Sequence, residues 1–322
     1  MRRFLLSLIL VSLLVCMMPQ AYAQELYPFS GSGTESDPFL ISSPSDLCTL
    51  SELVNNGASF TGQFFLQTQS LDMQGISFIP IGLYGESSYF CGTYDGNGHY
   101  LSNLNITYGG NNSLFGMLGG TVMNLGIESG QITGACVGSF ASHSSSSSAL
   151  IINCYNKATV NGARAGGIAD NFNGTILNCW TDCDLNASES GRIGAIYSYS
   201  TLFQKNCYTS RILETSNAIP NENCEYIPAD ANNADQLVSA LNNHIVDSAI
   251  AARLKSHDLN LWTIDEFGNI TLSPKNYSLR IRDNPSYIQA NMIYIVPGTL
   301  SLISLVLLFC DFSKRQKPSK AA

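Results

Sequence analysis

The chain is poor in charge and in histidine. Only 12% of its 322 residues are Asp, Glu, Lys or Arg, and it has four histidines and two tryptophans. The histidines lie in four separate segments, and none belongs to an HExxH sequence, which excludes a zinc peptidase of that type. The sequence also lacks a GxSxG motif and a glycine-rich phosphate-binding loop, two common signals of catalytic domains.

The charge that is present is mainly negative. The formal net charge is −8 at pH 7. Without Arg2, Arg3 and the basic segment 311–322, 10 basic and 23 acidic residues remain, a net charge of about −13. A surface of that sign repels phosphate backbones, so we expect no nucleic-acid partner.

The first residues are typical of a signal peptide. Arg2 and Arg3 precede an apolar run over residues 4–18, and an Ala-Tyr-Ala sequence at 21–23 has the small-x-small pattern of a signal-peptidase site. The apolar run is too short to span a membrane comfortably. The pattern predicts a signal peptide over 1–23, with cleavage before Gln24 and export of the mature chain.

Residues 292–310 form a second apolar segment, which contains no charged residue and is followed by a basic stretch. Its length and the basic residues after it predict a transmembrane helix over 292–310, a cytoplasmic tail over 311–322 and a stalk over 275–291. A buried core helix is the alternative. No LPxTG-like sequence precedes the segment, so we prefer a plain anchor to a sorting signal.

A short phrase recurs through the middle of the chain, in which Asn follows a small β-prone run and precedes Leu or Cys. It stands at Asn103, Asn124, Asn153, Asn178 and Asn206, at intervals of about 21, 29, 25 and 28 residues. Repeats of this length cannot bury their own apolar face, so they stack on their neighbours into a solenoid. We therefore expect these five asparagines to lie in one column.

Eight cysteines lie outside the predicted signal peptide and anchor, and three of them, Cys154, Cys179 and Cys207, follow a repeated Asn. Stacked strands would bring them about 4.8 Å apart, a separation that a disulfide can use. Because stacked side chains point in parallel, the preferred interpretation is an interior ladder of small apolar residues. Cys179 and Cys183 have no nearby His, which argues against zinc.

The segments on either side of the repeats have helical patterns. Ser43 and Pro44 suit the N-cap and first position of a helix, which carries an apolar face and ends at Asn56 and Gly57. This helix would cap the first coil within a region spanning 24–94, before regular coils over 95–228. Residues 229–274 would form a C-terminal helix, over 233–256, and a closing hairpin.

Several phrases together resemble bacterial surface proteins with GLUG repeats, although the run at 165–170 departs from the central motif of that repeat. The resemblance implies an all-β, right-handed parallel β-helix solenoid. Such repeats occur in adhesin-like exported proteins and beside the peptidase domain of immunoglobulin A peptidases. The phrases are GSGTESDPFLIS, FCGTYDGNGHYLSNLNI, SLFGMLGGTVMNLGI, LIINCYNKATVNG, AGGIADNFNGTILNCWT and LWTIDEFGNITL.

Two groups of polar residues could carry chemistry. The turn from Asp95 through Asn97 to His99 is either a calcium site or, as we prefer, a tight turn, because no later acidic residue completes a shell. The second group would serve a polysaccharide lyase or glycoside hydrolase, although a solvated acidic edge is the preferred interpretation. It comprises Asp170, Asp182, Asp184, Glu189 and Arg192.

Two classes of function remain open. The first is a non-catalytic cell-surface protein, an adhesin-like or interaction module held to the membrane by its C-terminal helix, with a host protein or glycan as ligand. The second is an exported polysaccharide lyase or glycoside hydrolase on a β-helix scaffold. We assign no catalytic, cofactor-binding or metal residue, and expect no cofactor.

Overall fold

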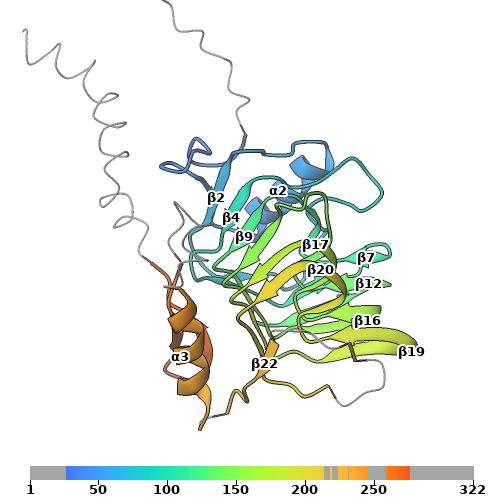
Figure 1. The fold of residues 1–322 in the computed structure, drawn as a ribbon. Helices are drawn as coiled ribbons and strands as arrows, with labels where there is room; N and C mark the ends of the chain where they lie inside the picture. Colours follow the sequence, from blue (N-terminus) through green and yellow to red (C-terminus); the bar gives the residue numbers. More distant parts are fainter. Residues whose placement is uncertain (1–26, 214–217, 220–223, 231, 246–258, 276–322) are drawn as a thin grey trace, which may run out of the picture.

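The computed structural model describes residues 27–213, 218–219, 224–230, 232–245 and 259–275. These residues form a parallel β-solenoid of three sheets, which we call A, B and C (Figure 1). Sheet A has nine strands: β1 (Phe39–Ile41), β2 (Phe64–Gln67), β4 (Thr93–Asp95), β8 (Phe115–Leu118), β9 (Thr121–Met123), β13 (Ala141–Ser144), β14 (Leu150–Ile152), β17 (Ala169–Leu177) and β20 (Tyr197–Lys205).

Sheets B and C complete each coil. Sheet B has seven strands: β3 (Leu71–Asp72), β5 (Tyr100–Ser102), β10 (Gly126–Ile127), β15 (Tyr155–Asn156), β18 (Trp180–Thr181), β21 (Cys207–Thr209) and β22 (Cys224–Tyr226). Sheet C has six: β6 (Leu104–Ile106), β7 (Asn111–Asn112), β11 (Gly130–Thr133), β12 (Cys136–Gly138), β16 (Thr159–Gly166) and β19 (Leu185–Gly194). The predicted stack of parallel strands is therefore confirmed.

Strand register sets the length of a coil. In sheet A, Tyr94, Val122, Ile151, Ile176 and Gln204 are successive Cα partners, separated by 28, 29, 25 and 28 residues. The last three of these intervals match the last three of the sequence phrase, because the phrase marks one corner of each coil.

The corner between sheets A and B is made by asparagine. Asn124, Asn153, Asn178 and Asn206 each have a positive φ of 50° to 56°, a conformation that Asn adopts more readily than most residues. Asn103 has the same backbone conformation but follows β5 and precedes β6, so it lies at the corner between sheets B and C. The prediction of one column is confirmed for four residues and wrong for Asn103.

The solenoid interior is apolar. Cys154, Cys179 and Cys207 are at most 1% exposed within it, which confirms the interior ladder. Burial raises the pKa of the Cys179 and Cys207 thiols well above the ordinary value, so both stay protonated. Each thiol instead lies near backbone carbonyls, as in the 3.2 Å contact from Cys179 Sγ to the Leu177 oxygen.

A helix covers the N-terminal end of this interior. Helix α2 (Pro44–Asn55) begins after Ser43, whose hydroxyl accepts a hydrogen bond from the Asp46 amide. Its apolar face contributes Leu47, Leu50 and Val54 to the same core as the first strands. The helix therefore lies where the sequence predicts it and buries the apolar end of the stack.

A second helix and a hairpin lie on the outer side of sheet B (Figure 1). Helix α3 (Ala234–Ile245) begins within the predicted range 233–256, and residues 246–258 lie outside the described residues. Strands β23 (Trp262–Ile264) and β24 (Ile270–Leu272) form the antiparallel hairpin. The helix and hairpin pack with aromatic side chains of sheet B in one cluster, which includes Tyr155, Trp180, Tyr208, Leu237, Leu241, Trp262 and Leu272.

The described residues contain no helix that is long and apolar enough to cross a membrane. The predicted signal peptide over 1–23, the transmembrane helix over 292–310 and the tail over 311–322 lie outside the described residues.

Candidate functional site

The acidic group that the sequence singles out is divided between two places. Asp170 lies in β17 and is fully buried, whereas Asp182 and Asp184 follow β18 and are partly or largely exposed. Arg192 lies in β19, and the side chain of Glu189 lies outside the described atoms. The described members of the group therefore do not form one cluster.

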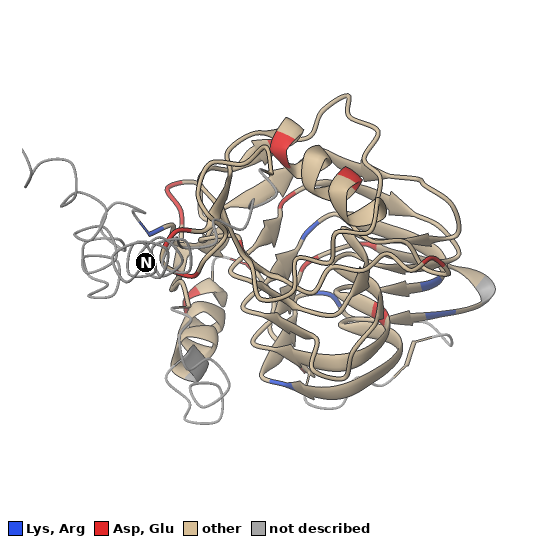
Figure 2. Cartoon of the chain, turned by 90° about the horizontal axis from the view of Figure 1, so that it is seen from above, with Lys and Arg blue, Asp and Glu red and all other residues tan. Residues whose placement is uncertain are grey.

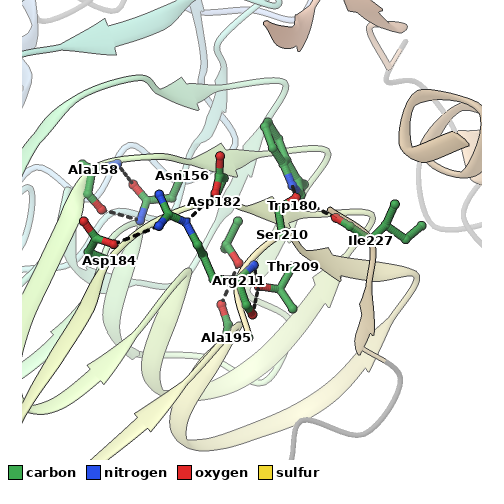
Figure 3. Close-up of polar contacts among 11 residues, drawn as sticks. Asn156, Ala158, Trp180, Asp182, Asp184, Ala195, Thr209, Ser210, Arg211 and Ile227 are labelled. Carbon is green, nitrogen blue, oxygen red and sulfur yellow. Dashed lines mark hydrogen bonds and ion pairs between the residues drawn. The ribbon is translucent and has the colours of Figure 1, made fainter. Parts of the chain in front are cut away.

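Asp182 and Asp184 share one arginine (Figure 3). The Nε of Arg211 donates to the Asp182 carboxylate at 2.7 Å, and Nη1 lies 3.3 Å from the Asp184 carboxylate. Hydrogen bonding to Asp182 and the charge of that carboxylate raise the pKa of Arg211. Since β18 and β21 are paired, the carboxylates and the arginine come from adjacent coils.

The polar groups around this ion pair form hydrogen bonds with one another (Figure 3). The Asn156 side chain accepts from the Ala158 amide and donates to its carbonyl, at 3.0 and 3.1 Å. The indole N–H of Trp180 donates to Ser210 Oγ, which donates to the Ile227 carbonyl, each at 2.8 Å. These hydrogen bonds stabilise the segments that follow β15, β18 and β21. Arg211 balances one of the two negative charges of Asp182 and Asp184.

Asp170 makes a buried, bidentate ion pair. Arg164 donates from Nε and Nη2 to its two carboxylate oxygens, at 2.9 and 2.7 Å, and Ser198 donates a third hydrogen bond at 2.7 Å. The hydrogen bond to Asp170 raises the pKa of Arg164. The predicted solvated edge is thus wrong for Asp170, because a neighbouring strand brings Arg164 across the turn to cover it.

Arg164 also lies against an exposed aromatic ring. Its guanidinium carbon is 4.6 Å from the ring centroid of Tyr199, and that of Arg192 is 5.3 Å from the same centroid. Arg164 and Arg192 are Cα partners in adjacent strands of sheet C. Tyr199 is 48% exposed. We call Arg164, Asp170, Arg192 and Tyr199 the Arg–Tyr site.

Arg164 and Tyr199 are not among the residues predicted from the sequence to carry chemistry. A signal was present, because Arg164 and Arg192 are separated by one coil length and each is followed by a small or apolar residue and Gly. Two basic residues in equal positions of successive repeats become neighbours in the stack.

The candidate calcium turn is accounted for by its hydrogen bonds. The Asp95 carboxylate accepts from the Asn97 amide at 2.8 Å and from Asn124 Nδ2 at 2.9 Å. Asn97 Nδ2 donates to the Lys275 carbonyl at 3.0 Å. These contacts favour the tight turn. Among the described residues, no group of three or more His, Cys, Asp or Glu could hold a metal ion.

His143 lies near the buried ion pair. Its ring stacks on Tyr84 with centroids 3.9 Å apart, and the side chain is 7% exposed with Nδ1 lacking a hydrogen-bond partner. Burial lowers the pKa of His143, the charge of Asp170 opposes that shift and the charge of Arg164 adds to it. His143 is therefore a neutral, buried base at pH 7.

Comparison with known proteins yields only distant similarity. No family model matches the chain. It is 31% identical to "Halomucin" of Haloquadratum walsbyi over 154 residues, which are 44% of this chain and 2% of that protein, so the chain spans about 2% of its curated relative. A crystal structure named "putative immunoglobulin A1 protease", from Bacteroides ovatus, is similar with a TM-score of 0.46 and 16% identity, over 76% of this chain and 95% of that one.

Proposed function

We propose that this protein is a non-catalytic cell-surface protein, an adhesin-like module that displays a right-handed parallel β-solenoid on a membrane anchor. The predicted signal peptide and anchor support display outside the cell. The GLUG-like phrases and the local similarity to a halomucin support a surface role. The stacked coils favour a stiff body, because each coil is hydrogen-bonded to its neighbours along three sheets.

One observation carries the non-catalytic part of the proposal. Each acidic residue of the candidate group whose side chain is described is paired with an arginine: Asp170 with Arg164, and Asp182 and Asp184 with Arg211. A general acid or base must reach the substrate, and its pKa must suit proton transfer. Asp170 has no exposed surface, so it cannot contact a polymer without unfolding of its surroundings.

A second function has one specific observation in its favour. Asp182, Asp184 and Arg211 place two carboxylates and a cation on adjacent coils, which is the kind of arrangement that a polysaccharide lyase or glycoside hydrolase on this scaffold requires. In that case Arg211 would have to release one carboxylate when the substrate binds.

The test compares binding with turnover on the full chain. A glycan array and a cell-binding assay measure binding. Release of reducing sugar and absorbance of unsaturated products, on acidic and neutral polysaccharides, measure turnover. We expect binding without turnover.

Turnover that disappears in Asp182→Asn or Asp184→Asn, and persists in the exposed control Glu86→Gln, would replace the binding function by the enzyme. Absence of both binding and turnover would remove the proposed function altogether.

A further inference from the structure

We propose that the Arg–Tyr site binds an acidic polysaccharide, with Arg192 pairing with a sugar carboxylate and Tyr199 contacting the sugar ring. This inference rests on the proposed binding function and names the class of ligand.

The first support is an unbalanced positive charge. Arg164 and Arg192 are Cα partners on adjacent strands, and like charges placed directly opposite each other destabilise a sheet. Asp170 neutralises Arg164 through two hydrogen bonds. In the described part of the chain no carboxylate pairs with Arg192, which is exposed. An anion bound at Arg192 would balance its positive charge, as Asp170 balances that of Arg164.

The second support is the geometry of the arginines. A guanidinium binds a carboxylate best through two parallel N–H groups, and Arg164 already shows this geometry with Asp170. Arg192 presents the same fork one strand away, and the Tyr199 ring centroid lies 5.3 Å from its guanidinium carbon. Contact with the ring limits the conformations of the long side chain, so less entropy is lost when an anion binds.

The third support is the aromatic surface. Tyr199 is 48% exposed, although it lies beside two guanidinium groups. The face of an aromatic ring is electron-rich, so it attracts the C–H groups that line one side of a sugar ring. An aromatic side chain beside a free guanidinium therefore suits a sugar that carries a carboxylate.

The same strands continue as an uncharged polar surface. Asn186 Nδ2 donates to Asn161 Oδ1 at 2.8 Å, and Asn161 Nδ2 donates to Thr133 at 3.2 Å, which forms a ladder across sheet C. Asn161 and Arg164 both lie in β16, on either side of an irregularity in its pairing with β19. Amide and hydroxyl groups on the same strands could bond the hydroxyls of neighbouring sugars, so the site suits a polymer better than a single small anion.

The charge of the remaining surface favours an acidic polysaccharide over nucleic acid as the ligand. The chain has a net charge of −8, and apart from the adjacent pair Arg164 and Arg192 its few Lys and Arg residues are scattered over the described ribbon (Figure 2). Nucleic acid, with a phosphate at every residue, needs an extended basic surface. A polysaccharide with spaced carboxylates needs only one local cation at each contact.

The experiment measures dissociation constants of the full-length chain for sodium polygalacturonate, dextran sulfate and neutral dextran at two salt concentrations. We expect polygalacturonate to bind more tightly than neutral dextran, and its binding to weaken at high salt. Arg192→Gln and Tyr199→Ala should each raise the dissociation constant for polygalacturonate about tenfold, and Arg192→Lys should raise it less. Tyr199→Phe should bind polygalacturonate as the wild type does. Lys205→Gln, at the far end of β20 from Tyr199, is the matched control for the loss of one positive charge and should leave the dissociation constants unchanged.

Three outcomes would overturn the inference: no binding of polygalacturonate by the folded wild type, equal binding by Arg192→Gln and wild type, or preference for dextran sulfate. Thermal unfolding of each variant separates loss of binding from loss of structure. Binding to a neutral glycan or a protein with an affinity that Arg192→Gln does not change would overturn this inference and leave the proposed function intact. Turnover of polygalacturonate with a KM raised in Arg192→Gln would support this inference and overturn the proposed non-catalytic function.

Discussion

The indole N–H of Trp262 donates a 2.6 Å hydrogen bond to the side-chain oxygen of Asn153, 109 residues earlier in the chain. The same oxygen accepts from Asn178 Nδ2 at 2.9 Å, and Asn153 Nδ2 donates to Asn124 and to the Asn260 carbonyl. One corner residue thus joins three successive coils and the C-terminal segment.

The first prediction concerns this asparagine. Asn153→Gly keeps a residue that tolerates positive φ but removes four hydrogen bonds, and leaves two buried donors without a partner. Each such donor costs about 1–3 kcal/mol, so we expect a loss of about 2–6 kcal/mol in the free energy of unfolding. Asn153→Ala should cost about 1 kcal/mol more, because Ala disfavours that backbone conformation.

Urea unfolding of the full chain checks this result, with Asn103→Gly as the matched control. Asn103 has the same backbone conformation, but its side chain is exposed and donates to the exposed Asp72 carboxylate. The control should change stability by about 0.5 kcal/mol. Similar losses in the two glycine variants would show that the buried hydrogen bonds of Asn153 to Asn124 and Asn178 do not add to stability.

The second prediction separates the two kinds of ion pair. Asp170→Asn leaves Arg164 partly buried without a carboxylate, which costs about 3–5 kcal/mol for a buried pair, reduced here because the Arg164 side chain is 28% exposed. Asp182→Asn removes a partner of the half-exposed Arg211 and should cost about 0–1 kcal/mol. Denaturant midpoints compare the two variants directly. A larger loss for Asp182→Asn would contradict the burial of Asp170.

Some of these features could be predicted from the sequence and some could not. The coil length and the Cys154, Cys179 and Cys207 ladder left a periodic signal, because an equal place in each coil is an equal place in space. Asn103 misled the prediction because it has the same backbone conformation as the column although it lies at the corner between sheets B and C. Its interval of about 21 residues, shorter than a coil, was the available warning.

The Arg164–Asp170 pair could not be predicted, because the two residues are six apart in sequence and meet only through the conformation of the turn between them. Nor could the sequence show where α3 docks. Its periodicity identifies an apolar face, but the partner, the aromatic outer side of sheet B, is defined by the stacking of distant repeats.

The third prediction concerns the interior ladder. Cys179→Ser introduces a hydroxyl at a fully buried position, where it costs about 1–3 kcal/mol if its hydrogen bond is poor. Cys91→Ser, at a half-buried position, is the matched control and should cost less. Thermal unfolding measures both under reducing conditions. An unchanged melting temperature in Cys179→Ser would argue against a tightly packed interior.

The last prediction concerns pH. In the unfolded chain His143 protonates near its ordinary pKa of about 6.5. In the folded chain burial lowers the pKa, so protonation needs a lower pH. Below about pH 6.5 the unfolded state therefore binds more protons than the folded state, and the free energy of unfolding falls as pH falls. Above that pH both states hold a neutral imidazole, and His143 contributes no slope.

His143→Gln tests this, because it replaces the ring by a side chain that does not titrate. We expect the variant to lose less stability than the wild type between about pH 7.5 and pH 5.5, measured by urea unfolding at each pH. Some slope should remain, since burial also lowers the pKa of His99. The difference in the free energy of unfolding between the two proteins at the higher pH measures the packing against Tyr84 that the variant loses. It is the reference for the difference at the lower pH. Equal slopes in the two proteins, or a wild type more stable at the lower pH, would show that His143 is protonated within the fold.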